Sequence, residues 1–208
     1  MSSGTVRKLH YFDGRGRAEA IRLISVLGDE KIEENRYTFE EWPKIKPEMP
    51  LGQLPVLEID GGKFPQSLAI ARYLARQLKL GGKNDLESLK CDVIVDTMQE
   101  LNEGYYRAWF HIKDEQQKKE EQKIFINEVI SKKLEGAEKL MTTYGNGVWA
   151  VGDNPTWADL VVYDTIENLL KMDAQLLDKH SILKTNREAV AKLPKLAEYL
   201  ANRKQTPF

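Results

Sequence analysis

The chain has 208 residues, of which 41% are hydrophobic and 30% are charged. This composition provides enough apolar side chains for a packed core and excludes an intrinsically disordered chain. The 31 basic residues are balanced by 32 acidic ones, so the net charge is -1 and the basic excess of nucleic-acid-binding proteins is missing. A chain of this length predicts one large domain or two small ones.

The cysteine and histidine content is equally restrictive. Cys91 is the only cysteine, which excludes an intramolecular disulfide, and its helical context predicts a packing residue. The histidines His10, His111 and His180 share no metal-ligand spacing, so we expect no metal site. No signal segment opens the chain, and no apolar run reaches the roughly 20 residues that cross a bilayer, which predicts a cytoplasmic protein without membrane partners.

Strand-like and helix-like segments alternate over the first 80 residues. In chain order the predicted elements are a strand at 7–12, a helix at 17–27, a weak strand at 33–37, a hairpin of two strands within 55–64 and a helix at 67–78. The hairpin prediction depends on the Asp60-Gly61-Gly62 turn. This order, βαβ followed by ββα, predicts a small α/β layer with a mixed sheet.

Helical patterns alone follow a linker of glycines and polar residues at 80–85. They cover 86–110 and 115–142, resume after 154–159, and end in a short pair within 186–203 that breaks at Pro194. The chain therefore predicts an α/β domain at residues 1–80 and an all-α domain at 85–208. Because small-molecule sites favour domain interfaces, we expect a ligand site between them.

A capping box explains one conspicuous motif. Thr156 and Asp159 have the threonine-x-x-acid spacing in which the two residues satisfy each other's backbone N–H groups at the start of a helix. We therefore expect Asp159 to have a role in folding and none in catalysis.

Three other positions allow both a structural and a functional interpretation. Pro55 opens a strand, and its preceding peptide is either an ordinary turn or a cis bond that presents the Leu54 backbone to a peptide-like ligand. Ser67 starts a helix either as a simple cap, or with Gln66 as a carboxylate site at the positive end of the helix dipole. Tyr11 ends the first strand, either as a packing aromatic or as a ligand-facing phenol.

Several segments form a recognisable series when they are taken together. They are Leu9-His10-Tyr11-Phe12 with Gly16-Arg17-Ala18-Glu19, Trp42-Pro43-x-x-Lys46, residues 50–61 (PLGQLPVLEIDG), 66–74 (QSLAIARYL), 92–97 (DVIVDT), 154–160 and Pro194-x-x-x-x-Tyr199. In order and separation this series resembles the cytosolic glutathione S-transferases. The nearest resemblance is to the sigma class, with its invertebrate transferases and glutathione-dependent prostaglandin D synthase.

The resemblance implies a fold and a state of assembly. It implies a thioredoxin-like N-terminal domain with a mixed four-stranded sheet and a cis Pro55, followed by a helical-bundle C-terminal domain. It also implies a cytoplasmic homodimer that takes glutathione as cosubstrate and requires no metal. Related prostaglandin synthases bind a divalent cation through clustered aspartates, and the matching positions here are Asp96, Gln99 and Glu100.

The resemblance also assigns roles to residues. Tyr11 is the implied catalytic residue, and Arg17 supports it electrostatically. The residues implied to bind glutathione are Tyr11, Arg17, Trp42, Lys46, Gln53, Leu54, Pro55, Gln66, Ser67 and, from the other subunit, Glu100. The expected electrophile pocket lies between the domains and is lined by Phe12, Arg15, Asn102, Tyr105, Tyr106 and Trp109.

The implied activity is conjugation of glutathione to hydrophobic electrophiles in detoxification. The alternatives are a dedicated glutathione-dependent prostaglandin D synthase, which is an isomerase, and a non-catalytic ligandin that binds apolar ligands such as haem. Retention of Tyr11, Arg17 and the glutathione-binding set favours an enzyme over a purely structural relative such as a lens crystallin.

Overall fold

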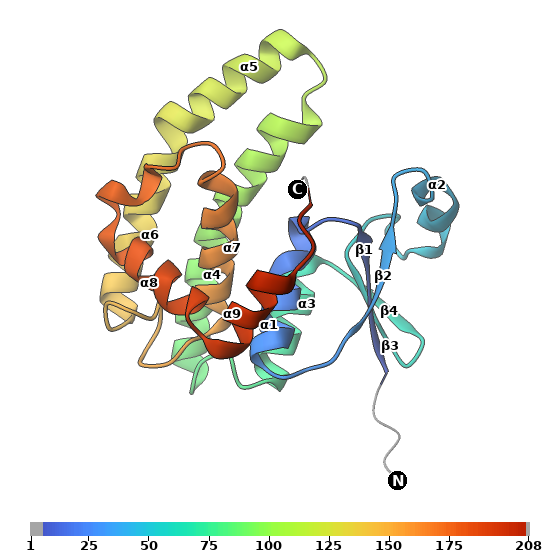
Figure 1. Cartoon of the computed structure of the whole chain (residues 1–208), viewed down its shortest axis with the longest axis horizontal. Coiled ribbons are helices and arrows are strands. Elements are labelled where there is room, and N and C mark those ends of the chain that lie inside the picture. The colour runs from blue at the N-terminus through green and yellow to red at the C-terminus, as the bar shows by residue number, and fades with distance from the viewer. Residues whose placement is uncertain (1–5, 207–208) are drawn as a thin grey trace. The chain divides into compact units, whose positions relative to one another are not determined.

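The structure is a computed structural model that describes residues 6–206. The described chain divides into two compact units (Figure 1). The first contains residues 6–81 together with 193–206, and the second contains residues 82–192. None of the helices within residues 6–206 combines the length and the apolar character needed to cross a membrane.

A mixed four-stranded sheet forms the centre of the first unit, as predicted. Its order is β2 (Glu33–Tyr37), β1 (Arg7–Phe12), β3 (Val56–Ile59) and β4 (Gly62–Pro65). Strand β1 is parallel to β2 and antiparallel to β3, and β3 pairs with β4 through the predicted hairpin turn.

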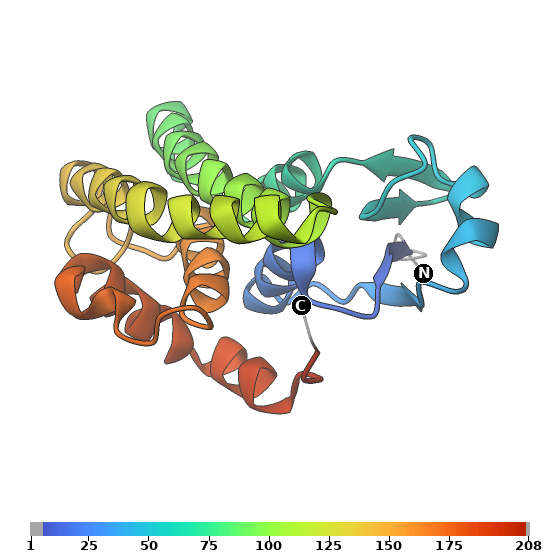
Figure 2. The same ribbon diagram turned by 90° about the horizontal axis from the view of Figure 1, so that it is seen from above.

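Helices α1 (Glu19–Leu27) and α3 (Ser67–Gln77) lie side by side on one face of the sheet, and α2 (Trp42–Ile45) lies on the other side (Figures 1 and 2). Both long helices are amphipathic, so each buries one apolar stripe against the strands. The resulting core contains Leu9, Ile21, Ile24, Leu57 and Leu74, all at most 2% exposed. A single 3₁₀ turn (Gly16–Ala18) connects β1 to α1.

The last helix, α9 (Pro194–Asn202), packs on α1 in the first unit. Its residue Leu196 is fully buried. The sequence pattern predicts all of residues 85–208 in one helical domain, because helical periodicity does not indicate which core receives the apolar face. The contacts of α9 instead join it to the α/β layer.

The second unit consists of helices, and no strand occurs among its described residues 82–192. The helices are α4 (Asp85–Tyr106), α5 (Glu115–Ile124), α6 (Ile130–Tyr144), α7 (Trp157–Leu169), a 3₁₀ turn (Leu176–Lys179) and α8 (Ser181–Ala191). The pattern predicted a helix from residue 186, whereas α8 begins five residues earlier in the chain at Ser181. Helix α7 is buried almost all round and packs against α4 and α8.

Two π-helical segments interrupt the long helical tracts of this unit. Residues Arg107–His111 extend α4, and Phe125–Val129 separate α5 from α6, where the pattern predicted continuous helix. A π turn inserts one extra residue into the helical repeat, and such turns recur at functional sites.

Asp159 has the structural role that its spacing predicts. Its carboxylate accepts the Thr156 N–H at 2.7 Å and the Thr156 hydroxyl at 2.9 Å. It also accepts the Ala150 N–H at 2.7 Å and an Asn186 amide hydrogen at 2.6 Å. The side chain is fully buried, and this burial raises the pKa of the Asp159 carboxyl. The carboxylate therefore ties the start of α7 to the preceding loop and to α8.

Candidate functional site

Tyr11 lies near the end of β1, and the loop that follows encloses its hydroxyl. The Tyr11 oxygen accepts the Arg17 backbone N–H at 2.8 Å, and the residue is 6% exposed. Gly16, with a φ of +39°, makes this approach possible, because a Cβ there would lie 2.4 Å from the Tyr11 oxygen. A phenol oxygen can accept one hydrogen bond while its hydrogen donates another, so acceptance from Arg17 is compatible with a donor role for Tyr11.

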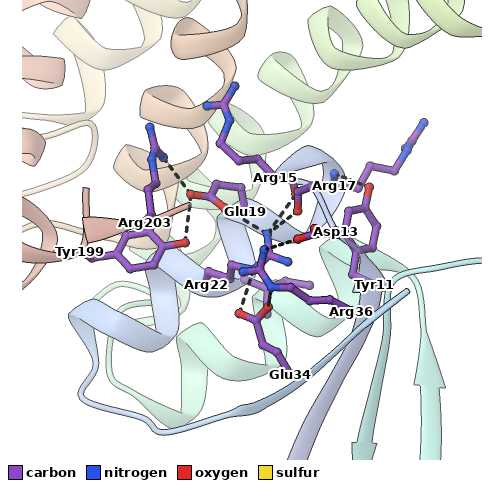
Figure 3. A network of polar contacts seen from close by, with 12 residues as sticks. Tyr11, Asp13, Arg15, Arg17, Glu19, Arg22, Glu34, Arg36, Tyr199 and Arg203 are labelled. Carbon is purple, nitrogen blue, oxygen red and sulfur yellow. Dashed lines mark hydrogen bonds and ion pairs between the residues drawn. The ribbon is translucent and has the colours of Figure 1, made fainter. Parts of the chain in front are cut away.

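A polar network supports this loop from behind (Figure 3). Arg22 donates to the carbonyl oxygens of Gly14 at 2.9 Å and Arg15 at 3.3 Å, and it also contacts the carboxylates of Glu19 and Glu34. The sequence motifs assign no function to Arg22. Its one signal is a glutamate and an arginine three residues apart in a helix whose other residues, except Ser25, are apolar.

Phe12 packs against aromatic side chains on the side of the sheet that carries α2. Its ring lies 5.4 Å from the ring of Trp42, edge to face, and 4.8 Å from that of Phe39. Lys46 follows directly after α2, and its side chain extends over Gly52, beside Gln53. The structure therefore brings Trp42, Lys46 and Gln53 to one region of the first unit.

The Leu54–Pro55 peptide is cis, as the family resemblance implies. Within residues 6–206, neither the backbone N–H nor the C=O of Leu54 has a hydrogen-bond partner. Both groups are therefore able to pair with an extended peptide-like ligand.

The start of α3 presents a second set of polar groups. Gln66 has a φ of +80°, which is unusual for a residue other than glycine, and Ser67 is the first residue of the helix. Neither side chain has a hydrogen-bond partner in the described part of the chain. A helix N-terminus with a free amide and a free hydroxyl suits an anionic group such as a carboxylate. No sequence pattern predicts the positive φ of Gln66.

The remaining predicted residues belong to the second unit. Glu100 is exposed and forms an ion pair with Lys133, and the Asn102 amide donates to the Thr165 hydroxyl at 2.9 Å. The rings of Tyr105 and Trp109 are stacked with centroids 5.1 Å apart. The cluster also includes Tyr106, Phe110 and Phe125.

The predicted electrophile pocket draws residues from both units. The Phe12 ring packs edge to face on Tyr11 and Arg15 is buried, both in the first unit, whereas the aromatic cluster belongs to the second unit. This pocket and the role of Glu100 stay predictions. Among the described residues, no three His, Cys, Asp or Glu side chains are grouped as a metal site.

Comparisons with known proteins agree across nearly the whole chain. The family model "Glutathione S-transferase, N-terminal domain" matches residues 7–76, and "Glutathione S-transferase, C-terminal domain" matches residues 99–203. S-crystallin SL11 of Nototodarus sloanii is 36% identical over 96% of this chain and 98% of its own length. Hematopoietic prostaglandin D synthase of Homo sapiens is 36% identical over 96% of this chain and 97% of its own length.

A solved structure shows the same fold. The sigma class GST of Fasciola hepatica superposes with a TM-score of 0.88 and 30% identity, over 98% of this chain and 99% of that one. The similarity therefore includes both units and the described candidate site.

Proposed function

The chain belongs to the glutathione S-transferase family, and we propose that it conjugates glutathione to hydrophobic electrophiles, with Tyr11 stabilising the attacking thiolate. The observation that carries the role of Tyr11 is its hydroxyl, held at 2.8 Å from the Arg17 N–H by a loop that Gly16 allows to approach closely. An oriented phenol can donate its hydrogen to a sulfur anion.

The benefit of such a donor follows from the acidity of thiols. A free thiol with a pKa of about 8.5 is only about 3% thiolate at pH 7, and the thiolate is the nucleophile. A hydrogen bond to the sulfur favours the charged form and lowers the thiol pKa. A decrease of two units takes about 2.7 kcal/mol and leaves most of the thiol ionised. Arg17 adds a permanent positive charge on the same loop.

Glutathione carries a carboxylate at each end and a peptide between them, and the first unit has groups suited to each part. We assign the γ-glutamyl carboxylate to Gln66 and Ser67 at the start of α3, and the cysteinyl backbone to Leu54. The glycyl carboxylate is assigned to Trp42 and Lys46. Support comes from the lack of hydrogen-bond partners for the Leu54 backbone and for the side chains at the start of α3, within residues 6–206.

A homodimer is part of the proposal. Its support is an apolar groove of about 430 Å³ along β3, β4 and α3, where Phe64 is 51% and Tyr73 is 39% exposed. Apolar surface of this kind is typical of an interface between copies of a chain. In such a dimer Glu100 is proposed to reach the glutathione of the partner. A cytoplasmic location completes the proposal and agrees with a single buried cysteine, Cys91.

Two relatives define the competing functions. The 36% identity to hematopoietic prostaglandin D synthase favours a glutathione-dependent isomerase as the second candidate. The equal identity to S-crystallin SL11 makes a non-catalytic protein the third, including a ligandin for apolar molecules such as haem. Assays of prostaglandin isomerisation and of haem binding separate these candidates from general conjugation.

Conjugation of glutathione to 1-chloro-2,4-dinitrobenzene tests the main proposal. The native chain and Tyr11→Phe are compared after both are shown to bind immobilised glutathione. We expect Tyr11→Phe to lose activity by about 10- to 100-fold, the value of one hydrogen bond to a charged atom. Tyr144→Phe is the matched control, because the Tyr144 hydroxyl has no hydrogen-bond partner within the described chain. Full activity of Tyr11→Phe, or an inactive native chain that binds glutathione, would contradict the proposal.

A further inference from the structure

Arg22 connects three segments of the first unit (Figure 3). It lies on α1, is 4% exposed, and its Nη1 donates to the carbonyl oxygens of Gly14 and Arg15 in the loop after β1. The same nitrogen lies 3.1 Å from the Glu19 carboxylate, and Nε donates to Glu34 of β2 at 2.9 Å. One guanidinium thus holds the loop, the first helix and an outer strand together.

The loop held by Arg22 is the one that fixes the Tyr11 hydroxyl. Gly14 and Arg15 directly precede Gly16, where a Cβ would lie 2.4 Å from the Tyr11 oxygen, and Arg17, whose N–H donates to that oxygen. The Arg22 guanidinium carbon also lies 5.9 Å from the centroid of the Tyr11 ring. Arg22 is therefore placed to act on Tyr11 both through the backbone and through its charge.

The carboxylates beside Arg22 are shared with other cations. Glu19 binds Arg22 with one oxygen, and its other oxygen accepts from Arg203 at 2.8 Å and Tyr199 at 3.2 Å. Glu34 likewise divides its oxygens between Arg22 and Arg36. Each carboxylate beside Arg22 is thus shared with a second guanidinium and compensates the charge of Arg22 only in part, while Arg36 is shared in turn with Asp13.

Arg22 does not use all of its hydrogen-bond donors. Its Nη2 is buried and has no hydrogen-bond partner within residues 6–206. A buried donor without a partner is rare in proteins, and here it leaves one nitrogen of the guanidinium without an acceptor.

We propose that Arg22 is a positioning residue for thiol activation, which orients the Tyr11 hydroxyl by holding the Gly14–Arg15 backbone and places positive charge beside the Tyr11 ring. This inference rests on the proposed function. The residue does not touch the substrate in this scheme. Its effect is on the pKa of the bound glutathione thiol, which both a well-placed donor and a nearby cation lower.

The test is the pKa of the thiol of bound glutathione, measured by ultraviolet difference absorbance of the thiolate and by the pH profile of kcat/KM. In Arg22→Gln we expect the thiol pKa to rise by about one unit, with a change in KM for glutathione below about threefold. Arg22→Lys keeps the charge but cannot reach both carbonyls and Glu34, so we expect a smaller rise in the same direction.

A second arginine offers a matched control. Arg187 in the second unit donates to Glu167 at 3.0 Å and lies 5.7 Å from the centroid of the Tyr163 ring. Arg187→Gln therefore removes a guanidinium that, like Arg22, pairs with a carboxylate and lies over a tyrosine ring but holds no backbone carbonyl near Tyr11, and we expect it to leave the thiol pKa unchanged. A role of Arg22 in stability alone would give Arg22→Gln the same result as this control.

Each outcome decides the question. An unchanged thiol pKa in folded Arg22 variants, with a lowered pKa in the native chain, overturns the role of Arg22 and leaves the proposed function intact. If the thiol of glutathione bound to the native chain has a pKa near the free value of about 8.5, both the role of Arg22 and the proposed function are contradicted. If Arg22→Gln fails to fold, Arg22→Lys decides, and failure of Arg22→Lys to fold assigns the residue to structure alone and overturns the proposal.

Discussion

The guanidinium of Arg203 lies 2.8 Å from the carboxylate of Glu19, although 184 positions separate the two residues in the chain. Glu19 is 1% exposed, so this contact anchors the end of α9 to the buried start of α1. Lys204 extends the anchor by an ion pair with Asp13, in the loop after Tyr11. The last residues of the chain thus support the loop on which the proposed activity depends.

Removal of this anchor is expected to destabilise the first unit. In Arg203→Ala the buried Glu19 keeps Arg22 and Tyr199 but loses a charged partner, which corresponds to about 2 kcal/mol. Urea unfolding of the full chain, followed by circular dichroism, measures the change. Lys195→Ala on α9, the helix that Arg203 directly follows, is the control, because its ion pair with Asp29 is exposed and we expect no measurable change. Equal losses of unfolding free energy in the two variants would show that the buried contact with Glu19 contributes no more stability than the exposed ion pair of Lys195.

Gly16 offers a direct test of the geometry at Tyr11. A methyl group at Gly16 would lie 2.4 Å from the Tyr11 oxygen, so Gly16→Ala must displace the hydroxyl. We expect conjugation to fall by about tenfold or more, the value of a lost hydrogen bond to a charged sulfur. Steady-state kinetics with 1-chloro-2,4-dinitrobenzene measures the loss.

Gly61→Ala controls for backbone strain. Gly61 has a φ of +85°, but a Cβ there meets no atom within 4 Å. Both variants therefore place alanine at a positive φ, which costs about 1 kcal/mol of stability each. Only Gly16→Ala should lose activity, and an equal loss in the two variants would attribute the effect to strain rather than to Tyr11.

Local patterns predicted much of this fold. Strand-like patterns and the Asp60-Gly61-Gly62 turn predicted the strands and the hairpin, and the Thr156–Asp159 spacing predicted a cap that the hydrogen bonds confirm. Features that depend on tertiary contacts had no local signal. The positive φ of Gln66, the attachment of α9 to the first unit and the π turns belong to this class.

The candidate site was predicted in a different way. No single pattern distinguished a functional Tyr11 from a packing aromatic, and the series of motifs shared with a known family made the assignment. That series did not include Arg22, because its relation to Tyr11 arises only when α1 folds back on the loop. Positions that act through another residue are therefore the ones that sequence motifs leave out.

Cys91 provides a test of burial in the second unit. Its side chain is fully buried, and burial raises the pKa of the thiol to about 12. At pH 8 the native thiolate fraction is then about one in 10,000, against about a quarter in the unfolded chain. We expect alkylation by iodoacetamide at pH 8 to be slower by more than about 1000-fold in the native protein than in urea.

The same thiol makes stability depend on pH. Because the native pKa lies above that of the unfolded chain, ionisation favours the unfolded chain, and stability falls as pH rises from about 8.5 towards 12. The slope from one proton approaches about 1.4 kcal/mol per pH unit. Urea unfolding of the native chain and of Cys91→Ala between pH 8.5 and 10.5 isolates this contribution. Parallel pH dependences in the two proteins would contradict it.

Gly104 links the π turns to the aromatic wall of the predicted electrophile pocket, which consists of Tyr105, Tyr106 and Trp109. A Cβ at Gly104 would lie 2.5 Å from the Phe125 ring, and that ring packs edge to face on Trp109, with centroids 6.0 Å apart. Gly104→Ala must therefore displace Phe125 and disturb the stack of Trp109 on Tyr105. We expect KM for 1-chloro-2,4-dinitrobenzene to rise by about threefold to tenfold, the value of an aromatic contact, while KM for glutathione stays the same.

Gly136→Ala in α6 is the matched control, since a Cβ there meets nothing within 4 Å and alanine favours helix by about 1 kcal/mol. That control should gain stability with unchanged kinetics, and a rise in both KM values for Gly104→Ala would indicate general disruption of the unit rather than a change in the aromatic wall.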